Sequence, residues 1–223
     1  RVPQTDVTPL NVSYSQVTAS MSDFIAAEYS DIFSQAKVNF DERRELVQVV
    51  GNAIGRRMDQ ITIDALNAAS GHTDVGTNVG GSATNMNLAK LLAAKKALDA
   101  KNVPAEGRCM LIHANGLSAL LDETELTSSD FATVKALAQG EINSFLGFKF
   151  IMLGDRDEGG LPLPSTRTNF AFHRDSVGLG VSIAQKTEIN YVAEKTSFLV
   201  SSMFSAGAIA IDAEGIVKIA ATE

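Results

Sequence analysis

The chain has 223 residues, of which 45% are hydrophobic and 20% charged, as is typical of a folded protein with one or two domains. Its net charge of −7 argues against a protein whose main task is to grip nucleic acid through its phosphates. One cysteine, Cys109, excludes an internal disulfide and lies in an apolar run typical of a buried, inert thiol. No apolar run reaches the roughly 18 residues of a membrane span.

Residues 1–36 do not have the pattern of a compact core. Pro3 and Pro9 bracket a polar, extended lead-in, and apolar side chains then alternate with polar ones in three short stretches. This pattern predicts strands with one mildly apolar face, arranged as a projecting hairpin. A lone hairpin is marginally stable in water, so its apolar face would pack either on the chain's own body or on a neighbouring molecule.

A long amphipathic helix is predicted over Asn39–Gly71. Asn39 is the expected N-cap, Glu42 would complete a capping box, and Gly71 would provide the C-terminal cap. Such a helix would span roughly 45 Å at 1.5 Å per residue. We expect its apolar stripe to lie on strands of residues 185–212. The polar face, which should meet solvent or a neighbouring subunit, carries Arg43, Arg44, Arg56 and Arg57.

Residues 71–87 are rich in glycine, threonine and asparagine and predict a loosely ordered connection. A second helix follows from Asn87 to about Lys101, with an apolar face made by Leu88, Leu91, Leu92 and Leu98. Its basic face is either solvated or in contact with an acidic partner. The basic residues are Lys90, Lys95, Lys96 and Lys101.

Short strands and helices alternate from Arg108 onward. Strands are predicted at 108–113, 148–152 and 167–172, and helices at 116–121 and 130–139. An exposed loop covers 155–166, and 173–182 is expected to be a turn or short helical passage. The last strands are predicted at 185–192, 197–211 and 216–220, with a hairpin turn at Asp212–Gly215.

No stretch of the sequence carries a catalytic signature. His72, His113 and His173 stand apart from the cysteine or carboxylate spacings of a zinc site, and no GxSxG motif surrounds Ser118. Asp155, Asp157 and Glu158 lack the rest of a calcium loop and predict a solvated acidic tip. We therefore expect no catalytic residue, no cofactor and no metal site.

Several stretches, in the same order along the chain, resemble the major capsid proteins of tailed bacteriophages. They are RVPQTDVTP, GRRMDQITIDAL, VPAEGRCMLI, SSDFATVKALAQGEINSFLGFKFIM, HRDSVGLGV and GAIAID. The resemblance implies the α+β Hong Kong 97-type fold, with an extended loop at 1–36. It implies a peripheral domain with a spine helix at 37–103 and 185–212, and an axial domain at 104–184 and 213–223.

The same resemblance implies particular contact residues. In the extended loop, the residues expected at the subunit interface are Val12, Tyr14, Val17, Met21, Ile25 and Tyr29. Asp155, Asp157 and Glu158 are candidates for a loop near the fivefold or sixfold axis. The lysines at 90, 95, 96 and 101 are the first candidates for an inward basic face. Residues 1–36 contain no lysine, so we expect no isopeptide cross-link from this loop.

The implied function is structural: hexamers and pentamers that form an icosahedral shell around double-stranded DNA, bound without sequence specificity. Portal and scaffold or cement proteins would be partners, no membrane would be involved, and the virion would be assembled in the host cytoplasm. An encapsulin-type compartment is the alternative within the same fold. A small-molecule enzyme built on residues 108–184 is the alternative of another class, but it lacks a paired acid, base or metal set.

Overall fold

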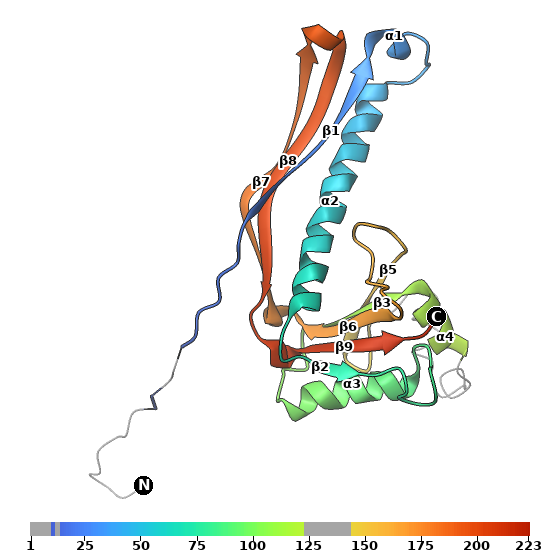
Figure 1. Ribbon diagram of the computed structural model, residues 1–223, viewed down its shortest axis with the longest axis vertical. Coiled ribbons are helices and arrows are strands. Elements are labelled where there is room, and N and C mark those ends of the chain that lie inside the picture. The colour runs from blue at the N-terminus through green and yellow to red at the C-terminus, as the bar shows by residue number, and fades with distance from the viewer. Residues whose placement is uncertain (1–9, 12–13, 123–143) are drawn as a thin grey trace, which may run out of the picture.

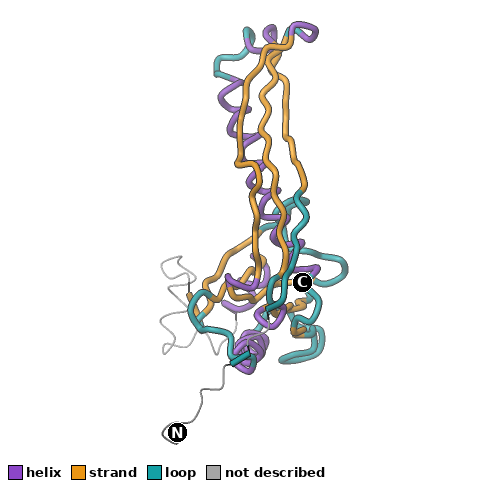
Figure 2. Tube along the Cα trace, turned by 90° about the vertical axis from the view of Figure 1, so that its left-hand side faces the viewer, coloured by secondary structure: helices purple, strands orange, loops and turns teal. Residues whose placement is uncertain are grey.

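The computed structural model describes residues 10–11, 14–122 and 144–223. A long rod rises from a broader unit built on a six-stranded sheet (Figure 1). The rod is narrow when viewed from the side, with its helix lying behind its strands (Figure 2). The predicted helix at 130–139 lies outside the described residues.

The long helix α2 spans Glu42–Ala68, 27 residues or about 40 Å. It confirms the predicted helix but begins later, because Asp41 and not Asn39 is the N-cap and accepts a hydrogen bond from the Arg44 amide. The side chain of Gln35 binds the Phe40 carbonyl and the Glu42 amide, which holds the preceding turn together. Glu42 accepts a hydrogen bond from the Ser30 hydroxyl, so it ties the helix start to a strand.

The rod's sheet has three antiparallel strands in the order β1-β8-β7. The strands are β1 (Ser22–Asp31), β8 (Ser197–Ala210) and β7 (Val177–Val192). A short helix, α1 (Ile32–Gln35), joins β1 to α2, and a 3-10 turn, η2 (Ala193–Lys195), joins β7 to β8. The predicted N-terminal hairpin is wrong, because β1 pairs with β8 from the other end of the chain and the described residues before it form no strand.

Strand β7 also begins earlier than predicted. Residues 177–181, expected within a turn, pair with the lower part of β8. The Met21 and Ile211 side chains lie close to this part of β7: a Cβ at Gly180 would lie 2.7 Å from the Met21 methyl group, and one at Gly178 would lie 3.0 Å from Ile211 Cδ1. The strand therefore continues to the base of the rod, where Val177 pairs with Ala210.

Helix α2 packs its apolar stripe on β8, as predicted, and also on β1, which the prediction did not include. Ile54, Phe204 and Ala206 are buried together, with Phe24 and Met58 beside them. The arginine face differs in part from the prediction. The Arg57 guanidinium lies 4.6 Å from the centroid of the Phe24 ring, and the Arg43 guanidinium lies 4.7 Å from the centroid of the Phe198 ring. These two arginines therefore extend over aromatic rings of the sheet and do not point freely into solvent.

The six-stranded sheet has the order β2-β9-β6-β3-β5-β4. Its members are β2 (Thr73–Val75), β9 (Ile216–Ala221), β6 (Arg167–His173), β3 (Arg108–His113), β5 (Phe148–Leu153) and β4 (Ser144–Phe145). Helices α3 (Leu88–Ala100) and α4 (Ala114–Asp122) pack on one face, around Leu91, Met110 and Phe148. The end of α2 packs on the other face through Ile63 and Leu66. Both faces of the central strands are therefore covered, while β5 near one edge leaves Ile151 and Met152 exposed.

Two connections differ from the predictions. The turn before β9, η3 (Ala213–Gly215), follows β8 of the rod and leads into the six-stranded sheet, so it joins different sheets and not two strands of a hairpin. Just before this turn, the Ile211 and Asp212 amides donate to the Ser176 carbonyl in η1 (Arg174–Ser176). The 71–87 connection is ordered, because β2 pairs with β9 and Thr84 bonds to the Thr77 and Val79 carbonyls. Both β2 and α3 pack with the six-stranded sheet, although the predicted peripheral domain included them.

Candidate functional site

The segment before β1 is extended and exposes its apolar side chains. It runs away from the base of the rod (Figure 1). Tyr14 is 92% exposed and Leu10 is 89% exposed, while Val17 and Met21 are about half exposed. Val12 lies outside the described residues. Exposed apolar side chains that follow one another along a segment are typical of a surface that binds another molecule.

No helix among the described residues packs on the sheet face opposite α2. Ile25 and Tyr29 lie on it because they alternate along β1 with Phe24, which faces the helix. Ile25 is 71% exposed and Tyr29 is 40% exposed, and they pair across the ladder with Met203 and Leu199. The Lys195 ammonium lies 4.2 Å from the centre of the Tyr29 ring. We call this uncovered sheet face the far face of the rod.

Strand β7 forms one edge of the rod, and no described strand pairs with its outer side. Two shifts of register interrupt its pairing with β8 between Val181 and Lys186. The Lys186–Glu188 ion pair lies beyond these shifts, and its hydrogen bond raises the pKa of Lys186 and lowers that of Glu188. Bulges and charges are common devices against uncontrolled edge pairing. The large apolar residues exposed on this strand are Leu179, Val181, Ile183, Ile189 and Tyr191.

The acidic loop after β5 lies against α2 and is not a freely solvated tip. Glu158 pairs with Arg57, and the Gly159 amide donates to the Gln60 side chain. Asp155 pairs with Arg167, the first residue of β6. Asp157 is exposed and has no ion pair or hydrogen bond recorded among the described residues. Of the three predicted axial-loop residues, two therefore hold the loop to the body of the subunit.

A polar cluster at this end of the sheet explains why Asp155 is held. His113 lies 3.2 Å from Asp155 through Nε2 and 2.7 Å from Glu223 through Nδ1, and Arg167 donates to both carboxylates. The side chains of His113 and Arg167 are each only 4% exposed. The hydrogen bond between Arg167 and Glu223 raises the pKa of Arg167 and lowers the pKa of Glu223. The sequence alone did not predict the pairing of Arg167 with Glu223, because no local motif links positions so far apart.

The basic helix face is smaller than predicted. The prediction that Lys90 belongs to an exposed basic face is wrong, because Lys90 is fully buried and donates hydrogen bonds to the carbonyls of Thr84 and Ala220. Burial lowers the pKa of its ammonium. Lys101 forms an ion pair with Glu214 at 3.0 Å. Of the other two lysines, Lys96 is exposed and Lys95 is half-buried. Leu92, predicted on the apolar face, is instead 48% exposed.

The described residues hold no arrangement that signals chemistry. They contain no group of three or more histidine, cysteine or carboxylate side chains suited to a metal ion. His113 and His173 are buried and hydrogen-bonded, which agrees with a structural role. Cys109 is only half-buried, contrary to the prediction, although burial still raises the pKa of its thiol. Among the described helices, none has the length and apolar character needed to cross a membrane.

These features define a class of protein: a structural subunit with a self-contained core and a rod whose apolar surfaces another molecule must cover. Comparison with known proteins gives the particular family. The family model described as phage capsid protein matches residues 1–223, so the chain belongs to that family. It is a major capsid protein, a component of an icosahedral virion shell.

Solved structures share the fold at low sequence identity. The capsid of the cyanophage P-SCSP1u is 16% identical with a TM-score of 0.74, covering 99% of this chain and 79% of that one. The structure from Mycobacterium phage Che8 is 19% identical with a TM-score of 0.69, covering 89% and 70%. A virus-like particle from Pyrococcus furiosus is 13% identical with a TM-score of 0.61, covering 89% and 75%. A comparison with curated proteins finds no match.

The fold prediction is therefore confirmed: the chain has the Hong Kong 97-like α+β architecture of phage capsids. The family match also favours the virion shell over the encapsulin-type compartment. The small-molecule enzyme alternative gains no support, since the match is to a structural family.

Proposed function

We propose that this chain forms hexamers and pentamers that close into a shell around double-stranded DNA. One observation carries the proposal: the rod and the segment before it expose apolar side chains that no described part of the same subunit covers. A subunit with such surfaces reaches a stable state when copies cover one another. Hexamers and pentamers are the closed rings from which icosahedral shells are built.

In this proposal the peripheral domain is the rod and the axial domain is the six-stranded unit. Residues 14–29 lie over a neighbouring copy, with Tyr14, Val17, Met21, Ile25 and Tyr29 as contact residues and Val12 as an expected sixth. The exposed fractions of these side chains support this role. The absence of lysine from residues 1–36 supports assembly without an isopeptide bond from this segment.

The proposed cargo is DNA held without sequence specificity. A net charge of −7 suits a container, because a strongly basic wall would bind its contents tightly. The remaining basic face, Lys95, Lys96 and Lys101, is the proposed inward contact. We further propose that the protein has no catalytic activity, that portal and scaffold or cement proteins act with it, and that assembly takes place in the host cytoplasm.

Electron microscopy of the purified protein tests the shell directly. Uniform closed shells are expected, and a protein that stays monomeric at all concentrations would overturn the proposal. Denaturing electrophoresis should then return a single monomer band, whereas covalent ladders would contradict assembly without cross-links.

The DNA contact needs a separate test. Replacing Lys95, Lys96 and Lys101 with glutamine should lower DNA retention in intact shells and weaken its dependence on salt. The matched control is Lys37→Gln, since Lys37 is exposed and lies between α1 and α2, far from α3. Equal retention by the triple variant and the control would remove these lysines from the inward face.

A further inference from the structure

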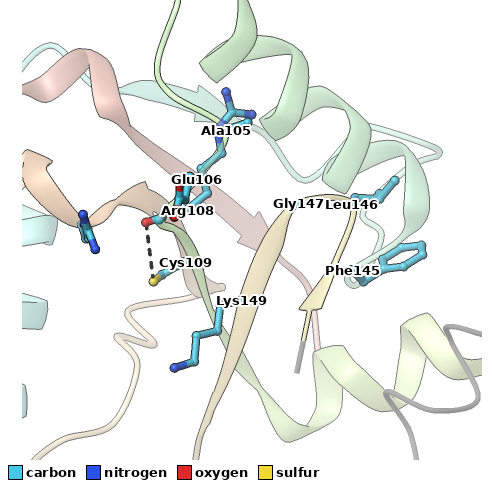
Figure 3. Close-up of a pocket in the computed structure, with 10 residues that line it drawn as sticks. Ala105, Glu106, Arg108, Cys109, Phe145, Leu146, Gly147 and Lys149 are labelled. Carbon is cyan, nitrogen blue, oxygen red and sulfur yellow. Dashed lines mark hydrogen bonds between the residues drawn. The ribbon is translucent and has the colours of Figure 1, made fainter. Parts of the chain in front are cut away.

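A hollow lies at the end of the six-stranded sheet where β3 and β5 begin. Its volume is about 650 Å³, and its wall includes Ala105, Cys109, Phe145 and Leu146. Figure 3 shows Cys109 and Lys149 from the adjacent strands side by side, with the Leu146–Gly147 turn beyond them. Leu146 and Gly147 have φ angles of 52° and 85°, values that suit a tight two-residue hairpin turn. The hollow therefore has a largely apolar wall held by regular backbone.

The rim of this hollow is basic. Lys149 is exposed and has no ion pair recorded among the described residues. Arg174 is 72% exposed, and its contact with Asp175 is long, at 3.4 Å. Both cations lie near enough to Cys109 to oppose the effect of burial on the pKa of its thiol. Glu106 is the acidic residue of the wall. An apolar wall with two cations at its edge suits a segment that carries both an apolar and an acidic side chain.

The same subunit presents such a segment at the opposite end of β5. Lys149 is near the start of this strand and Asp155 follows its end, which separates them by roughly 20 Å at about 3.3 Å per residue. The loop after β5 exposes Leu163, which is 54% exposed, and the unpaired carboxylate of Asp157. Its attachments to α2 and to Arg167 hold the loop in one position. The loop is therefore a preformed protrusion.

We propose that the loop of residues 157–164 in one copy docks into the Cys109–Lys149 hollow of the next copy, with Leu163 against the apolar wall and Asp157 beside Lys149. A protrusion and a hollow on opposite ends of one subunit make a head-to-tail contact, and such contacts close into rings when the rotation allows. This inference rests on the proposed shell and names the surfaces that join copies within one ring. The exposed charges chiefly select partner and orientation.

The single cysteine makes the contact testable by cross-linking. The variant Leu163→Cys places a second thiol on the loop, so that docking brings it near Cys109 of the next copy. Shells whose integrity has been checked by electron microscopy are oxidised with copper phenanthroline and run on non-reducing gels. The proposal expects a ladder that ends at five and six subunits. Intact shells that return only monomer would overturn it and leave the proposed shell function standing.

Two controls separate docking from random oxidation. Leu163→Cys combined with Cys109→Ser should give at most dimers, and Ser182→Cys, on the exposed surface of β7, should give no ladder. A ladder of equal length from Ser182→Cys would contradict the proposed geometry.

Charge exchange provides a test that does not depend on the cysteine variant. Lys149→Glu and Asp157→Lys should each lower shell yield at low salt, by ~tenfold if the reversed charges face like charges. The double variant should recover most of that yield, because opposite charges meet again. Single variants that assemble as well as the unmodified protein would overturn the contact. If the unmodified protein itself forms no shells, the proposed function fails and this contact fails with it.

Discussion

The six-stranded unit buries both faces of its central strands, whereas the rod buries only one face of its sheet. In the six-stranded unit, Met110 faces α3 and Leu111, the next residue, faces α2, so alternate side chains enter two cores. In the rod, Phe24 is covered by α2 while Ile25, the next residue, is 71% exposed. The two regions use the same strand alternation with different coverage. The six-stranded unit is therefore largely completed within one subunit, whereas the rod leaves apolar side chains of its sheet exposed.

The largest effect is expected in the core of the six-stranded unit. Phe148→Ala should lower the free energy of unfolding by about 4 kcal/mol, because a fully buried ring would leave a cavity between the sheet and its helices. Denaturation of the unassembled subunit measures this loss. The matched control is Phe33→Ala on α1, where the ring is 67% exposed and the change should be small. Similar losses for both variants would contradict the contrast between the core and the tip of the rod.

The polar cluster should have the next largest effect. Arg167→Met leaves Glu223 and Asp155 without their cation and should cost about 2 to 3 kcal/mol, below the range for a fully buried pair because Asp155 is 68% exposed. Arg174→Met, at an exposed residue of η1 just after β6, is the control and should cost little. Unfolding measured near neutral pH compares the two.

The same cluster makes stability depend on pH. The folded pKa of Glu223 is held below its unfolded value, so its contribution is complete above roughly pH 4.3 and declines as the pH falls through the folded pKa. Glu223→Gln should remove this part of the acid dependence. If the variant and the unmodified chain lose stability in parallel below pH 4.3, Arg167 does not stabilise the carboxylate of Glu223.

A smaller effect is expected at Lys90. Lys90→Met keeps an unbranched side chain, one atom shorter, but leaves the Thr84 and Ala220 carbonyls without their donor, at a cost of about 1 to 2 kcal/mol. Lys96→Met on the exposed side of α3 is the control.

The pH dependence at Lys90 has the opposite sign to that of Glu223. Because burial lowers the folded pKa of Lys90, the unfolded chain binds more protons between that value and about 10.4. Raising the pH through this window should therefore stabilise the unmodified chain relative to Lys90→Met. A constant difference between the two chains from pH 7 to about 10.4 would contradict a lowered pKa.

Local pattern was enough to predict much of the fold. Helices α2 and α3 were predicted from the period of their apolar residues, and strand β3 from its continuous apolar character. These signals depend only on neighbours in sequence. The pairing of β1 with β8 was not predictable in this way, because the two strands come from opposite ends of the chain. Lys90 was misplaced for the same reason: its carbonyl partner at Ala220 belongs to β9. The Arg167–Glu223 pair and the Cys109–Lys149 hollow likewise depend on tertiary structure alone.

The far face of the rod should show the smallest effect on folding and a clear effect on assembly. Ile25→Thr retains a β-branched side chain on a strand where it is already 71% exposed, so the free energy of unfolding should change by less than about 0.5 kcal/mol. If a neighbouring copy covers this face, the substitution buries a hydroxyl in an apolar contact and should raise the protein concentration at which shells form. Val49→Thr makes a comparable change on the opposite side of the rod, where Val49 is 58% exposed on α2. Light scattering and electron microscopy of both variants would show which side is covered. If only Val49→Thr impairs assembly, the neighbouring copy contacts the outer side of α2 and not the far face of the sheet.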